Sequence, residues 1–190
     1  DTQAFSLHIE KEEDLSGLPP SVIEMAAEEA SRRDKKGWVF TLDYPSYIPF
    51  MTYAENRELR KKLSLAFGQR GFQLNPQNNT DLILKLVKLR KERAQLLGYP
   101  SHAAFILEER MAQSEQNVKS FLDELATKAK PAAQKEWEIM ESFASKKLGL
   151  DQLEKWDTAY VAEKLKQAEL DLDEQQLKPY FPLNQVLQGL

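Results

Sequence analysis

SEQNVKSFLDELATKAKPAAQKEWEIMESFASKKLG, residues 114–149, is the longest helical pattern in the chain and sets the expected fold class. Ser114 is a residue type favoured as an N-cap, and Gly149 is one favoured just after a helix ends. Apolar residues recur every three or four positions, as on one face of a helix; they are Val118, Phe121, Leu122, Leu125, Ala129 and Ala132, continued by Trp137, Met140 and Ala144. Pro131 lies inside the pattern, and we expect it to kink or divide the helix.

Other helical patterns lie on both sides of this stretch. The expected helices cover residues 19–36, 46–71, 81–97, 101–112 and roughly 158–168. Asn56 is suited to cap a separate segment inside the second of them, and Thr80 and Ser101 are suited to cap the third and the fourth. In the helix over 81–97 we expect an inward face made of Leu82, Ile83, Leu86, Val87, Ala94 and Leu97.

One stretch, WVFTLDYP at residues 38–45, has the composition of a strand. A single strand needs a partner, and the alternating Phe5, Leu7 and Ile9 of residues 4–10 provide the best one. The predicted fold is therefore mainly all-α with one small N-terminal β-hairpin. We expect 1–190 to be a single fragment of a larger protein, made of a hairpin plus first helix (1–45), a helical bundle (46–150) and a lead-in to a region that is absent here (151–190).

Composition excludes several classes of function. The net charge of -4 and the pI near 5.4 give no general attraction to nucleic acid or to anionic lipid. The absence of cysteine removes disulfides, thiolate catalysis and cysteine-ligated zinc. No apolar run is long enough to predict a membrane-spanning helix. These features fit a cytoplasmic location, with the periplasm as the alternative.

Both ends of the sequence read as internal. The N-terminal DTQAFSLHIEKEED is polar, lacks an initiating Met and does not have the pattern of a signal peptide. At the other end, a helical apolar pattern formed by Leu183, Val186, Leu187 and Leu190 has no stop signal after it. We expect the chain to be part of a longer protein.

The residue types of a metal or catalytic site do not come together in this sequence. A catalytic zinc usually needs three protein ligands, and neither His8 nor His102 has a second histidine one helical turn away. The acidic run 171–174 begins like a calcium loop, but Gln176 and Pro182 stand where that loop needs Gly and Glu. We expect this run to cap a short helix instead.

For three further patterns, an ordinary structural role is favoured over a functional one. KLVKLRKER, residues 85–93, holds five Lys or Arg in nine positions and is read as a solvated helix face rather than a nucleic-acid site. Paired carboxylates such as Glu108 and Glu109 are adjacent, so on a helix they point about 100° apart and cannot flank one substrate bond. Tyr44, Tyr47, Phe50 and Tyr53 are spaced to line either a peptide groove or the core, with the core favoured. The site prediction is therefore none: no catalytic, cofactor-binding or metal-binding residue in 1–190.

Several stretches, taken in order along nearly the whole chain, resemble the thimet oligopeptidase family of zinc metallopeptidases. The resemblance is carried by LSGLP (15–19), WVFTLDYPSYIPFM (38–51), NRELRKK (56–62), LLGYPSHA (96–103) and ERMA (109–112), and then by Trp156, Asp157, Tyr160, Glu163, Lys164, Asp173, Glu174, Lys178, Pro179, Tyr180, Phe181, Gly189 and Leu190. They look closest to the peptidyl-dipeptidase (dipeptidyl carboxypeptidase) branch. Val161 stands where a second Tyr is common in the family, a difference expected to affect only packing.

The resemblance implies a longer parent enzyme that binds Zn²⁺ through a His-Glu-x-x-His helix and cleaves short peptides. None of those metal-binding positions has a counterpart in residues 1–190. We therefore predict a non-catalytic helical segment of a zinc oligopeptidase that releases dipeptides from peptide C-termini, with the missing catalytic region as its partner. The segment alone is expected to bind no zinc and to be inactive. The alternative is a non-enzymatic helical protein-interaction module.

Overall fold

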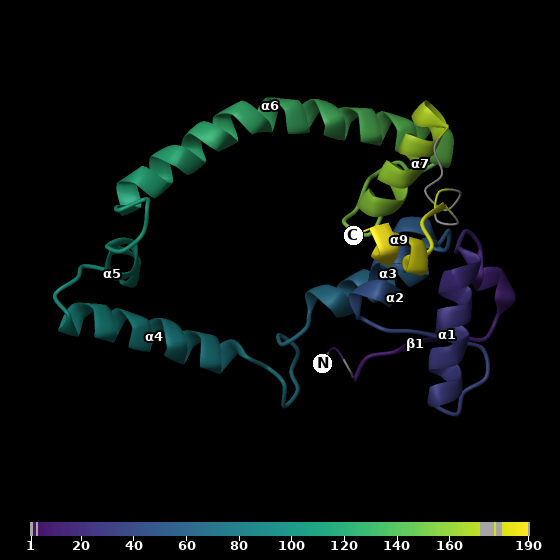
Figure 1. Cartoon of the computed structure of the whole chain (residues 1–190), viewed down its shortest axis with the longest axis horizontal. Coiled ribbons are helices and arrows are strands. Elements are labelled where there is room, and N and C mark those ends of the chain that lie inside the picture. Colours follow the sequence, from purple (N-terminus) through teal and green to yellow (C-terminus); the bar gives the residue numbers. More distant parts are fainter. Residues whose placement is uncertain (1, 3, 172–176, 178–179, 190) are drawn as a thin grey trace. The chain divides into compact units, whose positions relative to one another are not determined.

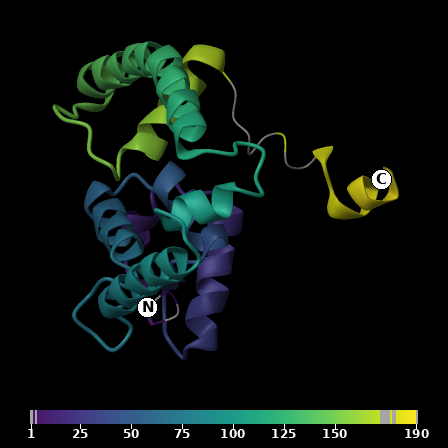
Figure 2. The ribbon, with the colours of Figure 1, turned by 90° about the vertical axis from the view of Figure 1, so that its left-hand side faces the viewer.

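The computed structural model describes residues 2, 4–171, 177 and 180–189. The chain divides into two compact units, one made of residues 1–68 with 140–190 and one made of residues 69–139. The elements are drawn in Figure 1 and, turned by 90°, in Figure 2.

The first unit begins with the small sheet that the sequence predicts. Strands β1 (Leu7–Ile9) and β2 (Trp38–Phe40) pair antiparallel, with Leu7 opposite Phe40 and Ile9 opposite Trp38. The chain between them forms a short 3₁₀ helix, η1 (Glu12–Leu15), and helix α1 (Pro20–Arg32), which contacts β2. The predicted strand pairing is confirmed, and the connection carries a helix rather than a tight turn.

Helix α1 starts where the sequence places a proline. Pro20 is its first residue, a position at which the missing proline N–H is not needed. Val22, Ala26 and Ala30 are buried on one side, and the small alanines allow the helix to approach the sheet closely. The helix ends at Arg32, and Gly37 adopts a left-handed φ of 85° at the entry to β2.

Helices α2 (Tyr44–Tyr53) and α3 (Arg57–Gly68) complete the core of this unit. Phe40 and Phe50 are fully buried, and their rings meet edge to face with centroids 4.6 Å apart. The Asn56 side chain accepts a hydrogen bond from Leu59 N at 3.2 Å, as the cap prediction requires. The buried apolar cluster consists of Leu7, Ile9, Leu15, Leu18, Val22, Ala26, Phe40, Leu42, Phe50, Met51, Ala54, Leu63 and Ala66.

Later residues of the chain also belong to the first unit. Helix α7 (Thr158–Leu170) confirms the helix expected at 158–168 and contacts α2. Helix α9 (Leu183–Gly189) lies near the C-terminus with Leu183, Val186 and Leu187 exposed. The acidic run 171–174, apart from Asp171 at the C-cap of α7, lies outside the described residues, as does Leu190.

The second unit contains α4 (Thr80–Leu96), α5 (His102–Leu107) and the beginning of α6 (Glu115–Leu148), which continues into the first unit. Ser101 caps α5 by accepting a hydrogen bond from Ala104 N at 2.9 Å, and Ser114 accepts one from Asn117 N at 3.1 Å. Thr80 is the first residue of α4 rather than its cap, and the N-cap is Asn79. Helix α5 ends at Leu107, earlier than the expected 112, and α6 runs past Pro131 as one helix.

The prediction that α4 and α6 bury their apolar faces is wrong for most of the residues named. In α4 only Ala94 is buried, while Leu82 and Leu86 are 64% and 45% exposed. In α6 Phe121, Leu122 and Leu125 are exposed and only Ala144 is buried. The periodicity correctly predicts helices, but a period of 3.6 residues cannot specify whether a neighbour covers the apolar face. Among the described helices, none is both long and apolar enough to cross a membrane.

Gly37 allows a test of this packing. A Cβ at Gly37 would lie 2.3 Å from the backbone oxygen of Ile9, whereas a Cβ at Gly149 would meet nothing within 4 Å. Both glycines have positive φ, so replacing either by Ala costs about 1–2 kcal/mol for the left-handed backbone. We expect Gly37→Ala to lower the free energy of unfolding by more than the matched Gly149→Ala, because the β1 backbone must also move. Urea unfolding followed by tryptophan fluorescence measures both; equal midpoints would contradict the close approach.

Candidate functional site

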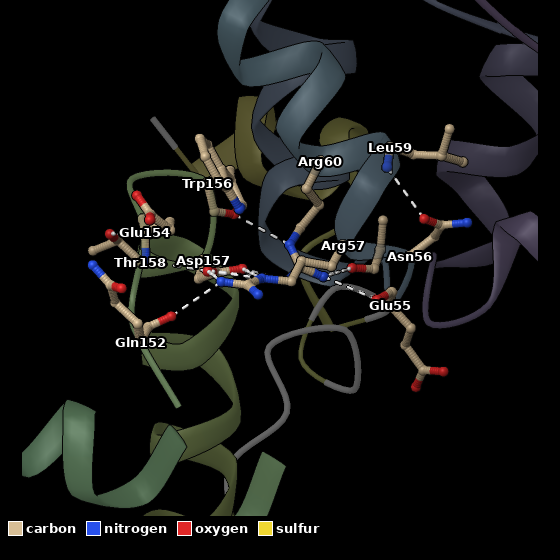
Figure 3. A network of polar contacts seen from close by, with 11 residues as sticks. Glu55, Asn56, Arg57, Leu59, Arg60, Gln152, Glu154, Trp156, Asp157 and Thr158 are labelled. Atoms are coloured by element: carbon tan, nitrogen blue, oxygen red, sulfur yellow. Dashed lines mark hydrogen bonds and ion pairs between the residues drawn. The ribbon is translucent and has the colours of Figure 1, made fainter. Parts of the chain in front are cut away.

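A network of charged side chains joins α3 to the segment that leads into α7, and it lies within the first unit (Figure 3). Arg57 and Arg60 are three residues apart on α3, so their side chains leave the same face of the helix. Asp157 is the residue immediately before α7. About 100 sequence positions separate the two arginines from the carboxylate.

Asp157 is fully buried and both of its oxygens are occupied. Arg57 donates from Nη2 to Oδ2 at 2.7 Å and from Nε to Oδ1 at 3.0 Å, a two-pronged contact. Arg60 donates from Nη2 to Oδ1 at 2.9 Å. The backbone N–H of Glu154 adds a bond to Oδ2 at 3.2 Å. A buried charge is costly without such partners, and here two cations share one carboxylate.

Arg60 connects this carboxylate to the end of α2. Its side chain is 1% exposed, and Nη1 donates to the backbone oxygens of Ala54 at 2.7 Å and Glu55 at 3.0 Å. These carbonyls follow the last turn of α2, where intrahelical partners run out. Nε donates to the backbone oxygen of Trp156 at 3.2 Å, and the guanidinium stands 4.1 Å from the centre of the Tyr160 ring. One side chain therefore bridges α2, α3 and α7.

Arg57 holds the loop that precedes α7. Its Nη2 donates to the backbone oxygen of Gln152 at 3.0 Å, in addition to its bonds to Asp157. A hollow of about 360 Å³ lies beside it. The lining residues carry both signs of charge, with Arg57 and Lys61 facing Glu58, Asp151 and Glu154. Such a lining does not select an anion or a cation.

The electrostatics of the network favour structure over catalysis. Burial alone would raise the pKa of Asp157, but hydrogen bonds from Arg57 and Arg60 outweigh it and lower that pKa below its ordinary value. The bond to Asp157 raises the pKa of Arg57. A general base works best with a pKa near the working pH and a free lone pair aimed at substrate. Asp157 has neither, so the network fixes the positions of helices.

The two histidines have separate surroundings. His8, the middle residue of β1, has its Nε2 2.6 Å from the backbone oxygen of Lys36, which precedes β2. His102 Nδ1 lies 3.3 Å from Arg93 Nη2, and partial desolvation followed by the charges of Arg90 and Arg93 lowers the pKa of His102. In the part of the chain that the structure describes, no group of three His, Cys, Asp or Glu side chains is placed to hold a metal ion.

The aromatic residues after β2 are divided between core and surface. Phe50 is fully buried, and Tyr47 and Tyr53 are half-buried against the core. Tyr47 stacks on Phe67 with ring centroids 4.0 Å apart, while Tyr44 is 67% exposed. Of the four aromatic residues Tyr44, Tyr47, Phe50 and Tyr53, the last three therefore pack with the core, as favoured from the sequence.

A separate hollow of about 170 Å³ lies between α1, β2 and the start of α2. It is lined by Val22, Met25, Ala26, Glu28, Glu29, Arg32, Val39, Thr41, Asp43, Pro45 and Ser46.

The adjacent carboxylates and the basic run lie in the second unit. Glu108 accepts a hydrogen bond from the Tyr99 hydroxyl, which follows α4, and thus has a local structural partner. The basic residues of 85–93 lie on the exposed part of α4, in agreement with a solvated face. Neither feature forms a reaction centre with another described group.

The sequence patterns did not predict the Arg57–Arg60–Asp157 network. Charge and periodicity gave no signal, because in the sequence each of the three residues looks like an ordinary surface charge. The available signal was the resemblance, since Arg57 and Arg60 lie in the NRELRKK stretch and Asp157 lies in the Trp-Asp pair.

Comparison with known proteins gives matches over the whole chain. The family model described as Peptidase family M3 matches residues 50–190. Oligopeptidase A of Haemophilus influenzae is 37% identical over 193 residues, which cover all of this chain and 28% of that protein. Oligopeptidase A of Escherichia coli is 36% identical with the same coverage, and dipeptidyl carboxypeptidase of Escherichia coli is 33% identical over 91% of this chain and 26% of its own length. The chain thus spans little more than a quarter of the length of these relatives.

Asp157→Asn tests the network directly. The substitution keeps the shape of the side chain and removes its charge, so Arg60 stays buried without a counter-ion. We expect a loss of about 3–5 kcal/mol in the free energy of unfolding, as for other broken buried pairs. The matched control is Asp151→Asn, an exposed residue of the same loop, expected to change it by less than about 0.5 kcal/mol. Urea denaturation measures both, and similar losses in the two variants would refute the assignment.

The network should also make stability depend on acid pH. Because folding lowers the pKa of Asp157, its contribution is complete above the unfolded-state pKa, about 4 for Asp, and is lost as pH falls through the folded-state pKa. The stability difference between the wild type and Asp157→Asn should therefore be constant near neutrality and shrink below about pH 4. Paired urea titrations at several pH values measure it. A difference that grows on acidification would have the wrong sign.

Proposed function

We propose, from the premise that this chain belongs to peptidase family M3, that it forms helical framework of a zinc-dependent oligopeptidase. The observation that carries the proposal is the family match over residues 50–190, a range that includes the whole buried ion network. The sequence-based resemblance is confirmed at the level of the family, and both oligopeptidase A and dipeptidyl carboxypeptidase proteins are among its relatives.

The described residues do not fit the zinc ion that such an activity needs. A catalytic zinc takes three protein ligands, and the described part of the chain offers no cluster of suitable side chains. The 190-residue sequence also contains no His-Glu-x-x-His. We therefore assign no catalytic step and no metal ligand to these residues. Their proposed role is to hold helices in place around a peptide-cutting centre formed by other residues.

The mode of cleavage has two candidates. Release of dipeptides from peptide C-termini was predicted from the sequence, and the 33% identity with dipeptidyl carboxypeptidase supports it. Cleavage inside short peptides is supported by the 36% and 37% identities with the two oligopeptidase A proteins. Short peptides are the proposed substrates in both cases. A cytoplasmic location remains a prediction.

The framework role predicts that the chain alone does not cleave peptides. The test is incubation of the purified chain with quenched fluorescent peptides and zinc chloride, with and without a chelator. We expect no chelator-sensitive cleavage, while oligopeptidase A of Escherichia coli in the same buffer serves as the positive control. Zinc-dependent cleavage by the chain would contradict the assignment.

A chimera separates the framework role from a non-enzymatic interaction module. This chain would replace the matching segment of Escherichia coli oligopeptidase A, to which it is 36% identical. A framework segment should leave the chimera able to cleave peptides, and Asp157→Asn in the chimera should reduce its thermal stability. A chimera that folds by circular dichroism, yet has no activity, would favour the interaction module.

A further inference from the structure

Helix α4 (Figure 1) lines a hollow of about 420 Å³ whose charged side chains are all cationic. The lining residues are Leu82, Lys85, Leu86, Leu89, Arg90 and Arg93. The three leucines are 64%, 45% and 52% exposed, so apolar and basic groups face solvent side by side. Pockets that bind ligands commonly measure roughly 300–1,000 Å³. The hollow therefore has a suitable size and lining for a ligand that is both apolar and anionic.

The cations of the hollow have no acidic partners within the chain as described. Among the residues that the structure describes, no carboxylate forms an ion pair with Lys85, Arg90 or Arg93. On the same helix but outside the hollow, Lys88 lies 3.9 Å from Glu92. Carboxylates bind arginine strongly, because two parallel hydrogen bonds can form between the two groups. The hollow thus leaves three cations available to carboxylates from another molecule.

One of these cations is already held in position by α5. Arg93 Nη2 lies 3.3 Å from His102 Nδ1, and its guanidinium stands 5.0 Å from the centre of the Phe105 ring. The positive charge extends to His102, whose pKa is lowered by desolvation and then by Arg90 and Arg93. A side chain that is ordered before binding loses less conformational entropy when a ligand arrives.

The leucines of the hollow have the spacing of a helix-binding face. Leu82, Leu86 and Leu89 are separated by four and three residues, so they lie on one side of α4 over about two turns. Helical peptides are recognised through apolar side chains at the same intervals. An exposed apolar patch beside charged groups is typical of an interaction surface.

The charges and the shape of α4 favour one kind of occupant. A second copy of the chain that used the same face would bring the same cations together and be repelled. A helix that lies on a membrane needs one apolar face and one polar face. Here Leu84 is 64% exposed and stands about 200° around the helix from Leu82, so the apolar residues of α4 are not confined to one face. An acidic peptide avoids both difficulties.

We infer that the hollow on α4 is a docking site for an acidic, leucine-rich helical segment of a partner protein. Apolar side chains of the partner pack between Leu82, Leu86 and Leu89. Carboxylates on the flank of the same partner helix pair with Lys85 and Arg90. This inference does not depend on the peptidase proposal, since it uses only the lining and the charges of α4.

Fluorescence anisotropy of a labelled peptide tests the docking site on the purified chain. The probe is a fluorescein-labelled peptide of Glu and Leu in which the leucines are three and four residues apart. A second peptide has every Glu replaced by Lys and is otherwise the same. The variants are Lys85→Gln with Arg90→Gln, and Leu86→Ala. Their matched controls on the same helix, outside the hollow, are Lys88→Gln with Lys91→Gln, and Leu84→Ala.

The acidic peptide should bind saturably and the basic peptide should not. Loss of Lys85 and Arg90 should weaken binding about five-fold, and Leu86→Ala should weaken it to a similar extent, because exposed ion pairs and a buried leucine each contribute modestly. The control variants should bind as the wild type does, with helical content equal in all by circular dichroism. Equal losses in the two charge variants would show attraction to the basic helix as a whole and would overturn the inference.

Two further results would also overturn it. One is equal binding of the acidic and the basic peptide, which would mean apolar adhesion without charge selection. The other is binding to vesicles of phosphatidylserine and phosphatidylcholine that the acidic peptide does not displace, which would assign α4 to a lipid surface. A peptide that competes with its own unlabelled form and weakens as salt is raised supports the docking site.

Discussion

A single buried carboxylate, Asp157, sets the arrangement of the first unit because its charge must be neutralised away from water. Desolvating an ion costs several kcal/mol, and the cost is offset only when partners surround it with good geometry. Arg57 and Arg60 provide those partners from one face of α3. Any arrangement of α7 that moved Asp157 from this position would leave the buried guanidinium of Arg60 without its counter-ion. The network therefore restricts how the later part of the chain can return to the core formed by the earlier part.

The network acts together with apolar packing. The Phe40–Phe50 contact and the alanine face of α1 form a core from residues within the first 68 positions. Hydrophobic burial has no direction, so it does not by itself fix where a helix from residues 158–170 must dock. Arg60 adds that direction, since its guanidinium binds the carbonyls that end α2 and the carboxylate that begins α7. Burial of apolar residues stabilises the unit, and the directed hydrogen bonds of Arg60 specify where α7 docks on it.

The two units differ in how far their apolar helix faces are buried. In the first unit the apolar faces of α1, α2 and α3 are covered by one another and by the sheet. In the second, most apolar residues of α4 and of the first half of α6 are exposed. In the proposed framework role, the ion network would hold the helices of the first unit in place. The chemistry of peptide cleavage belongs to other residues in this proposal.

The sequence by itself determined the element types. The signals are local: periodic apolar residues, prolines at helix starts, and the Ser101 and Ser114 caps. They act through backbone sterics and hydrogen bonds between residues close in the sequence. The pairing of β1 with β2 followed from alternation and from the need of one strand for another. Only the tertiary structure decided which apolar faces are buried, because Leu82 and Leu63 look alike in a periodic pattern while only Leu63 has neighbours that cover it. The same is true of Asp157: its role depends on two arginines about 100 positions away, and no local pattern records a contact over that distance.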